Sequence, residues 1–319
     1  MEIVAATKEE IPAIVELMKL SLGEALMPKS EAYFIWKHFT NPFGTSTILL
    51  AKQNEKIIGL RAFMKWQWVN KDGKYLAVRA VDTATLPSFQ GKGVFSKLTQ
   101  AVVKISETEG ASFVFNSPNP ISLRGYLKMG WYSIGKMPVK ITIGSLLPRF
   151  FSNESLNKFY NQYSVEKALQ KIHENWSLSF DTNNFHTPIC YNYLHWRYFE
   201  CPVAKYGAVI EPKKFGFIFR IKSISKFMEL RICECWAETN EGQKELNIEI
   251  KKLIQNIRPL LISEGTFQLG YKNSKLKRGP IVALLKGPIV TIRKLGNTSM
   301  EDFNHFKNWK PSLGSMELF

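Results

Sequence analysis

The sequence has no long apolar segment and no recognisable leader. None of its apolar runs approaches the ~20 residues that span the hydrocarbon core of a bilayer. The first residues, Met1 to Val4, have neither the basic start nor the apolar core of a signal peptide. We therefore expect a cytoplasmic protein without a transmembrane segment.

Cysteine is also scarce, with four residues in 319 and no C-x-x-C pair. Cys233 and Cys235 lie two apart in a predicted strand, so alternation places both on one face, which is a poor geometry for a disulfide. No further His or Cys pair at ligand spacing completes a metal site with them. We expect reduced thiols and no bound metal.

Acidic residues are too few to balance the basic ones, since 27 Asp and Glu face 43 Lys and Arg and leave a net charge of +16. Such a field attracts nucleic acid, an anionic coenzyme or the inner surface of a membrane. The densest basic patch lies at Lys272, Lys275, Lys277 and Arg278, and no basic helix, zinc module or aromatic RNA-binding signature accompanies it. We expect no nucleic-acid partner, whereas peripheral membrane contact stays open.

One junction between a strand and a helix carries most of the information. An alternating strand, Tyr75–Thr83, precedes the string LPSFQGKGVFSKL at 86–98, which opens an amphipathic helix that runs to about Thr108. The first N–H groups of a helix have no intrahelical partner and form the positive end of its dipole. Glycine lets an anion approach the backbone, and Lys92 adds charge. The pattern predicts a pyrophosphate-binding loop at Gln90–Gly93.

The spacing of this loop excludes the two commonest phosphate loops. No G-x-x-x-x-G-K-[ST] string occurs, and Ser96 stands where G-x-G-x-x-G needs its third glycine. The loop instead resembles Gln/Arg-x-x-Gly-x-small, the acyl-CoA loop of the Gcn5-related N-acetyltransferases (GNAT). Gln90 and Gly93 fill the first two fixed positions, and Phe95 departs from the usual Gly or Ala at the third.

A second element behind this loop strengthens the resemblance. The predicted strand Ala111–Asn116 is followed by NPISLRGYLKMGW at 119–131. This string resembles the family's Asn-x-x-Ala-x-x-x-Tyr-x-Lys-x-Gly-aromatic signature, with Ser122 in place of Ala. The start of the chain also resembles the family's first strand and helix, with Thr7 and Glu10 as a capping box. The resemblance covers residues 1 to about 135.

The fold that the resemblance implies is α/β. It is the GNAT acyl-CoA N-acyltransferase fold, a mixed and mostly antiparallel sheet flanked by helices. A hairpin formed by Thr47–Ala51 and Lys56–Met64, with Asn54 and Glu55 at its turn, agrees with this fold.

A repeat divides the chain into two halves. Residues 36–42 read WKHFTNP and residues 196–202 read WRYFECP, and each string is followed by two short strands, a longer strand and a helix. We predict a catalytic GNAT domain at 1–150 and a degenerate GNAT-like domain at 151–319. After Trp236 the second copy has a single glycine and three acidic residues, which repel a pyrophosphate.

The resemblance also implies roles for particular residues. Tyr126 is the general acid that protonates the leaving thiolate, and Asp82 is the predicted base, with His38, Glu107 and the carboxylate of Phe319 as further candidates. The predicted coenzyme-binding residues are the end of the long strand, the loop and one amide: Thr83, Ala84, Thr85, Gln90, Gly91, Lys92, Gly93, Val94, Phe95 and Asn119.

The acceptor is predicted from an aromatic and amide cluster early in the chain. Aromatic faces and Asn amides suit sugar rings, which favours Trp36, Asn41 and Asn116 as substrate-binding residues, although core packing explains Trp36 equally well. We expect an N-acyltransferase that uses acetyl-CoA, and no metal, to acylate a primary amine, such as an amino sugar of a bacterial surface polysaccharide.

Two other functions fit the same sequence. A tRNA-dependent aminoacyl transferase of the type that builds peptidoglycan bridges also has two acetyltransferase-like domains, and the basic charge suits tRNA. An intact loop at Gln90–Gly93 and the absence of a coiled-coil arm argue against it. A non-catalytic acyl-CoA-binding protein is the third reading, because Phe95 departs from the family pattern and no base is evident. The sequence does not determine the oligomeric state.

Overall fold

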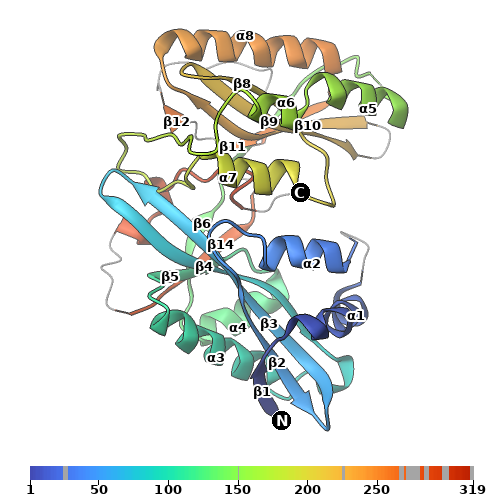
Figure 1. The fold of residues 1–319 in the computed structure, drawn as a ribbon, viewed down its shortest axis with the longest axis vertical. Helices are drawn as coiled ribbons and strands as arrows, with labels where there is room; N and C mark the ends of the chain where they lie inside the picture. Colours follow the sequence, from blue (N-terminus) through green and yellow to red (C-terminus); the bar gives the residue numbers. More distant parts are fainter. Residues whose placement is uncertain are drawn as a thin grey trace.

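The computed structural model describes residues 1–23, 28–149, 151–224, 227–265, 269–270, 281–283, 287–296 and 302–316. The predicted basic patch (Lys272, Lys275, Lys277 and Arg278) and Phe319 lie outside these residues. The described chain forms two stacked halves, each built on one sheet (Figure 1).

The first half contains sheet A and the helices of the N-terminal part of the chain. In spatial order the strands of sheet A are β1 (Glu2–Ala5), β2 (Thr47–Gln53), β3 (Lys56–Asn70), β4 (Gly73–Thr85), β5 (Phe113–Asn116), β14 (Ile289–Lys294) and β6 (Tyr132–Lys136). The helices are η1 (Lys8–Glu10), α1 (Ile11–Leu22), α2 (Glu31–His38), η2 (Pro87–Phe89), α3 (Val94–Thr108) and α4 (Pro120–Lys128). Only β4 and β5 pair in parallel, which confirms the predicted mixed, mostly antiparallel sheet.

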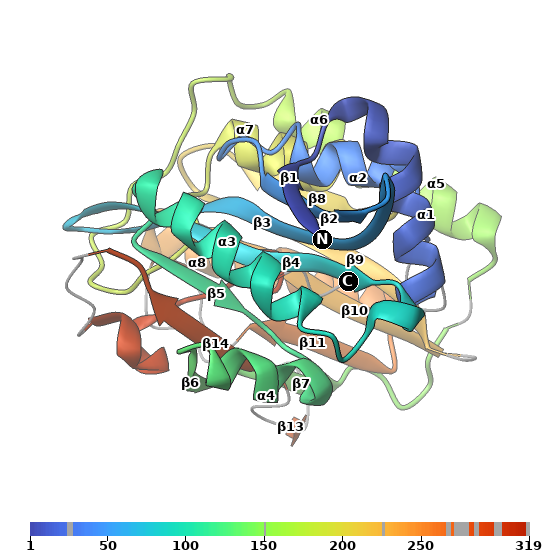
Figure 2. The ribbon, with the colours of Figure 1, turned by 90° about the horizontal axis from the view of Figure 1, so that it is seen from below.

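Local sequence explains these elements. Asn54 and Glu55 adopt φ values of 50° and 60°, the left-handed pair that a two-residue hairpin turn needs. The predicted capping box is present, because the Thr7 backbone N–H donates to the Glu10 carboxylate at 2.9 Å. Figure 2 shows α3 lying across sheet A, where it packs on β2, β3 and β4.

The second half contains sheet B, with α8 covering its outer face (Figure 1). In spatial order its strands are β13 (Ile281–Ala283), β7 (Val139–Ile143), β11 (Leu261–Gly265), β10 (Phe227–Ala237), β9 (Phe215–Ile224) and β8 (Gly207–Glu211), and β12 (Leu269–Gly270) also pairs with β10. Its helices are α5 (Asn153–Gln162), α6 (Val165–Leu169), α7 (Tyr191–Leu194), the π-helical η3 (His195–Phe199) and α8 (Asn240–Ile257). Two short helices of the C-terminal part, η4 (Asp302–Asn304) and η5 (Phe306–Asn308), instead pack against sheet A, where the Phe303 ring contacts Tyr75 and Phe113.

The two halves exchange a strand. β7 leaves the N-terminal part of the chain and pairs with β11 in sheet B, while β14 returns from the C-terminal part and pairs with β5 and β6 in sheet A. Each exchanged strand takes the same place in its sheet, since β2-β3-β4-β5-β14-β6 corresponds to β8-β9-β10-β11-β7-β13. The repeat in the sequence is therefore matched by a repeat in topology. The domain limits 1–150 and 151–319 stay predictions, and the exchanged strands cross them.

The two copies of the repeated string meet at the centre of the molecule. The indole rings of Trp36 and Trp196 stack with centroids 4.9 Å apart and planes 16° from parallel. Trp36 Nε1 donates to the carbonyl of Trp196 at 2.7 Å, and Trp196 Nε1 donates to the carbonyl of Trp36 at 2.9 Å. The contact is reciprocal, as expected for two copies of one motif related by a local two-fold axis.

A β-bulge interrupts the long strand of each half at the same place. In β4 the pairing with β3 shifts around Asp82, and in β10 the pairing with β9 shifts around Cys233. The second bulge corrects the prediction that Cys233 and Cys235 share a face. An extra residue breaks the two-residue alternation, so Cys233 packs in the core between the halves and Cys235 packs on the α8 side. All four cysteines are free thiols.

We expect Trp196→Phe to lower the free energy of unfolding by ~2 kcal/mol, because it removes one buried hydrogen bond and replaces the stacked indole by a smaller ring, while the Trp36 carbonyl keeps only its bond from Thr40 Oγ1. Urea unfolding followed by far-UV circular dichroism measures the change. Trp176→Phe is the control, since Trp176 is half-buried and stacks only at the edge of the core. A loss no larger than that of the control would contradict a central role for the pair.

Candidate active site

The edge of β4 opens where the sequence predicts a coenzyme. β4 pairs with β5 only from Ala77 to Arg79, although it continues to Thr85 along β3. In the described part of the chain no strand pairs with this side of Asp82–Thr85. β4 and β5 therefore separate beyond Arg79, and this leaves backbone N–H groups of the segment available to a ligand carbonyl.

The predicted phosphate loop has the backbone that an anion requires. Gly91 and Gly93 adopt φ values of 74° and 79°, and a Cβ added at either would meet nothing within 4 Å. The glycines are therefore needed for conformation and not for packing. Gly93 is the N-cap residue of α3. Because glycine has no side chain, no side-chain oxygen of the N-cap residue accepts from the first N–H groups of α3. Gln90 and Lys92 are exposed beside it.

A close contact brings this helix end against the sheet. A Cβ added at Gly59 on β3 would lie 2.5 Å from Val94 Cγ1 and 3.1 Å from Leu98 Cδ1. Glycine at this position lets the first turn of α3 pack directly on β3. Gln90 then reaches back, and its Nε2 donates to the carbonyl of Thr85 at 3.3 Å.

Tyr126 lies on α4 with its ring buried and its hydroxyl held by a charged group. It is 3% exposed, and Arg61 Nη2 donates to its hydroxyl oxygen at 2.5 Å. Arg61 Nη1 also donates to the carbonyl of Val81 on β4 at 3.2 Å. Through Arg61 the predicted acid is therefore connected to the open edge of β4.

The large side chain of Phe95, at a position where the family has Gly or Ala, fits into space next to α4. Its ring packs edge-on against Tyr126 with centroids 5.5 Å apart. A Cβ added at Gly125 would lie 3.1 Å from the Phe95 ring, so Gly125 on α4 provides the room that a large residue at 95 needs. The pair Phe95 and Gly125 closes the contact between the first turn of α3 and α4.

Asn119 has a structural role in addition to the predicted one. It is the N-cap residue of α4, and its Oδ1 accepts from the Ser122 N–H at 2.8 Å and from Ser122 Oγ at 2.9 Å. Replacing the family's Ala by Ser122 therefore adds a second bond to the same cap. The Asn119 side chain is exposed, so its amide Nδ2 remains on the surface.

Asp82, at the β4 bulge, is held by two residues of α2. His38 Nε2 lies 2.8 Å and Lys37 Nζ lies 3.1 Å from its Oδ2. His38 is itself fully buried and contacts Ser46 Oγ through Nδ1 at 2.9 Å. Burial alone raises the pKa of Asp82, but the charge of Lys37 and the hydrogen bond with His38 outweigh it and hold this pKa far below its ordinary value.

This pairing argues against Asp82 as the base, a role that stays a prediction. A carboxylate kept charged by a neighbouring ammonium binds a proton too weakly to deprotonate an amine efficiently. His38 does not replace it as an exposed base, because the ring is buried and both nitrogens have partners. Glu107 lies on the last turn of α3 and is exposed.

The three predicted substrate-binding residues are buried and take part in packing and interior hydrogen bonds. Trp36 is 5% exposed and stacks on Trp196. Asn41 binds the carbonyl of Lys65 and the N–H of Phe43, which fixes the loop after α2. Asn116 is buried and accepts from Thr291 on the exchanged strand β14. All three are therefore buried and contribute to packing or to the interior hydrogen bonds, and their role in binding a substrate stays a prediction.

Two charged residues near the site were missed from the sequence. Arg61 is the single charged residue in the apolar run 57–64, and that contrast with its neighbours is a usable signal. Lys37 gave no signal, because a lysine between two aromatic residues of a helix is ordinarily exposed. Only the approach of α2 to the β4 bulge makes it a buried partner of Asp82.

The equivalent loop of the second half has a different geometry. Thr239 is the N-cap residue of α8 and accepts from the Gly242 N–H at 2.9 Å, so this helix end is already capped. A Cβ at Gly242 would lie 2.2 Å from the Lys214 carbonyl oxygen, so this glycine allows close packing and not an open loop. β12 also pairs with β10 at Trp236 and Ala237, which covers the edge that is open in β4.

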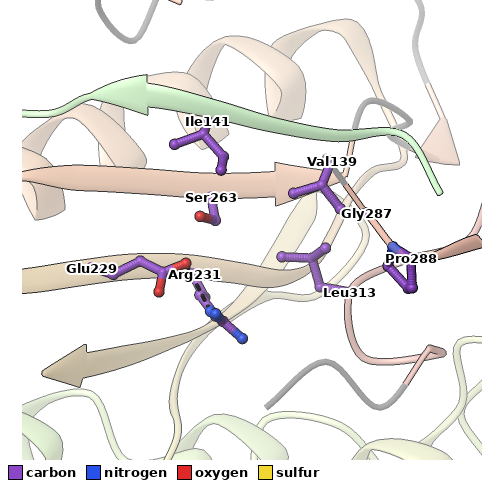
Figure 3. Close-up of a pocket in the computed structure, with 8 residues that line it drawn as sticks. All are labelled: Val139, Ile141, Glu229, Arg231, Ser263, Gly287, Pro288 and Leu313. Atoms are coloured by element: carbon purple, nitrogen blue, oxygen red, sulfur yellow. Dashed lines mark hydrogen bonds and ion pairs between the residues drawn. The ribbon is translucent and has the colours of Figure 1, made fainter. Parts of the chain in front are cut away.

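A separate cavity of about 190 Å³ lies on sheet B (Figure 3). Its wall includes an ion pair in which Arg231 Nε lies 2.8 Å from Glu229 Oε1, and Ser263 on the neighbouring strand. The other lining residues are Val139, Ile141, Gly287, Pro288 and Leu313. None of the predicted site residues lines this cavity, so it is distinct from the open edge of β4.

The described part of the chain lacks two features, a membrane-spanning helix and a cluster of metal ligands. None of the helices in the described ranges is both long and apolar enough to cross a membrane. Among the same residues, no cluster of three or more His, Cys, Asp or Glu has the arrangement of a metal site.

The N-terminal part of the chain matches one protein family. The family model, described as an acetyltransferase (GNAT) domain, matches residues 2–134. Residues 2–134 therefore match an acetyltransferase (GNAT) domain, in agreement with the two signatures. No curated protein matches the sequence.

Solved structures resemble both halves together. A conserved protein of unknown function from Enterococcus faecalis V583, described as a probable N-acyltransferase, superposes with a TM-score of 0.64 at 13% identity, over 92% of this chain and 72% of that chain. A GCN5-related N-acetyltransferase from Anabaena variabilis ATCC 29413 gives 0.60 at 11% identity, over 92% and 73%. Eis1 from Mycobacterium abscessus gives 0.54 at 12% identity, over 92% and 74%. At these identities the likeness establishes the fold, and it confirms the predicted GNAT fold followed by a GNAT-like second part.

We expect Asp82→Asn to lower the free energy of unfolding by ~3 kcal/mol near neutral pH, because it removes the carboxylate that faces the buried Lys37 ammonium. The pKa of Asp82 is lower in the folded than in the unfolded chain. Its contribution is therefore complete above about pH 4, the ordinary value for Asp, and is lost as the pH falls further.

Urea unfolding at a series of pH values measures this dependence. The stabilities of wild type and Asp82→Asn should converge on acidification. Asp72→Asn is the control, since Asp72 is exposed in the β3–β4 turn and its loss should change stability by less than ~0.5 kcal/mol. A constant difference between wild type and Asp82→Asn at every pH would contradict the assigned ion pair.

Proposed function

We propose that the protein is an acyl-CoA-dependent N-acyltransferase, with acetyl-CoA as donor and a primary amine as acceptor. In this proposal residues 1–150 form the catalytic domain and residues 151–319 a supporting domain that binds no coenzyme. The proposed acceptor is an amino sugar of a bacterial surface polysaccharide. The proposed location is the cytoplasm.

One observation carries it: three features that acyl transfer needs are joined by direct contacts. Arg61 connects the Tyr126 hydroxyl to Val81 at the open edge of β4, and Phe95 connects Tyr126 to the first turn of α3. The unpaired N–H edge, the uncapped helix start and a buried hydroxyl therefore surround one junction. Left-handed glycines at 91 and 93 leave room for a pyrophosphate at the helix start.

The parts of the junction have separate tasks. The loop Gln90–Gly93 would hold the pyrophosphate, and the Asn119 amide would bind the pantetheine arm. Acetyl-CoA supplies an acyl group on a thioester, whose sulfur leaves when an amine attacks the carbonyl. Backbone N–H groups of Asp82–Thr85 would polarise that carbonyl, as in other oxyanion-stabilising sites.

Tyr126 would donate its proton to the departing sulfur, because a phenol and an alkyl thiol hold a proton with similar strength. Asp82, fixed by Lys37 and His38, would set the geometry of the bulge instead of accepting a proton. We assign no side chain as base, and the acceptor amine then reacts in its neutral form.

The binding part of the proposal is tested by Gly93→Glu. A carboxylate at the helix start opposes the pyrophosphate, so calorimetric titration with acetyl-CoA should show no binding where wild type binds with micromolar affinity. Gly110→Glu is a matched control, since Gly110 has φ of 81°, open space at its Cβ and a place at the other end of α3. Coenzyme binding by Gly93→Glu equal to that of the control would refute the loop assignment.

A parallel titration with unacylated tRNA distinguishes the proposed function from that of a tRNA-dependent aminoacyl transferase. Tight tRNA binding by wild type, without coenzyme binding, would assign the protein to the aminoacyl transferases that build peptidoglycan bridges. If wild type binds neither acetyl-CoA nor tRNA, both the acyl-CoA-dependent and the tRNA-dependent transferase are refuted.

The catalytic part is tested by Tyr126→Phe. Loss of the general acid should reduce kcat by ~10²-fold or more and leave acetyl-CoA affinity unchanged. Release of free thiol from acetyl-CoA, with a panel of amino sugars as acceptors, measures turnover. Tyr132→Phe is the control, because Tyr132 lies on β6 and its hydroxyl contacts Asn304. If wild type binds acetyl-CoA but no amine is acylated, the protein is a coenzyme-binding protein and not a transferase.

A further inference from the structure

Arg61 is a buried cation without a carboxylate beside it. Its relative exposure is 0%, and its two side-chain hydrogen bonds go to the carbonyl of Val81 and the hydroxyl of Tyr126. Its Nε has no partner. Among the described acidic residues, none forms an ion pair with Arg61. A buried guanidinium in this state is costly, since one donor is unsatisfied and no anion balances the charge.

Three aromatic rings surround the guanidinium and offset part of this cost. Its central carbon lies 5.0 Å from the ring of Phe63, 5.5 Å from Phe95 and 5.4 Å from Tyr126. Cation–π contacts stabilise a desolvated guanidinium but leave its net charge in place. The positive charge is thus kept next to the open edge of β4, where a negative charge would be stabilised.

The direction of one hydrogen bond determines where the Tyr126 proton goes. An arginine N–H can only donate, so the Tyr126 oxygen is the acceptor in the bond with Arg61. The hydroxyl proton of Tyr126 must then point elsewhere. In the described part of the chain this proton has no hydrogen-bond acceptor.

We infer that Arg61 is a positioning residue that directs the Tyr126 proton at the coenzyme sulfur and stabilises the negative charge that Tyr126 acquires. This inference rests on the proposed function. In the step concerned, the amine nitrogen forms a bond to the acyl carbon and the carbon–sulfur bond breaks with its electron pair on sulfur. The Tyr126 proton moves to that sulfur and gives a free thiol. Arg61 faces the resulting phenolate until solvent returns a proton, and the proton lost by the amine goes to solvent.

A binding experiment isolates the sulfur without the need to know the acceptor. Calorimetry compares coenzyme A with desulfo-coenzyme A, which lacks the thiol, at a mildly alkaline pH where part of the thiol is ionised. Wild type should prefer coenzyme A by ~10-fold, the net effect of one charge-assisted hydrogen bond. Tyr126→Phe and Arg61→Met should each reduce the preference to less than ~2-fold, and the double variant should show no further loss.

Arg293→Met is the matched control. Arg293 lies over the neighbouring Trp131 ring at 5.3 Å and donates to the Met129 carbonyl at 2.8 Å, but it does not contact the Tyr126 hydroxyl. This variant should keep the ~10-fold preference. Affinity for desulfo-coenzyme A within ~2-fold of wild type shows that a variant retains a folded site. Arg61→Gln, which keeps a neutral donor, takes the place of Arg61→Met if the latter does not fold.

Different results would refute the role of Arg61 and the proposed acyltransferase function. An undiminished preference in Arg61→Met or Arg61→Gln, with the preference lost in Tyr126→Phe, would overturn the role of Arg61. A preference that survives Tyr126→Phe would show that the hydroxyl does not meet the sulfur. If wild type binds neither coenzyme A nor its desulfo form, the proposed function itself fails.

Discussion

The reciprocal contact of Trp36 and Trp196 is the constraint on which the rest of the arrangement depends. Each indole N–H binds the carbonyl of the other residue, and the rings stack in the core between the halves. Trp36 lies on α2, so the same contact fixes the helix that brings Lys37 and His38 to Asp82. The exchanged strands β7 and β14 then tie each sheet to the other half of the chain. The site is therefore positioned by both halves, although its own residues come from the first.

Small differences separate the two halves, although their strands follow the same order. Both long strands have a bulge at the equivalent place, yet beyond Arg79 no described strand pairs with the β5 side of β4, whereas β12 covers the corresponding part of β10. Gly93 gives α3 an open, uncapped start, whereas Thr239 caps the start of α8. One half can present backbone N–H groups to an anion, and the other has already satisfied them.

Each half also buries charge beside its bulge, and the second half uses this charge for structure. Glu234 accepts hydrogen bonds from Tyr193, Tyr198 and Ser312, and burial raises its pKa above the ordinary value. Arg197 is buried nearby and donates to the carbonyl of Gly314. These bonds hold the C-terminal segment of the described chain between the halves. In the first half Arg79 is used in the same way, since it donates to the carbonyls of Ser315 and Met316, whereas Arg61 and the Lys37–Asp82 pair are buried beside the proposed site.

The sequence by itself determined the hairpin turn at Asn54 and the strand-to-helix turn with glycines at 91 and 93, because each rests on local spacing that the backbone must obey. It indicated the fold class through the resemblance of two signatures to a known family, and the repeat through two similar strings. It could not determine which polar residues face a ligand. Asp82, Asn41 and Asn116 look like site residues in the sequence, and their partners come from segments far along the chain. The β-bulges, the strand exchange and the burial of Arg61 likewise depend on contacts between distant segments, which only tertiary structure decides.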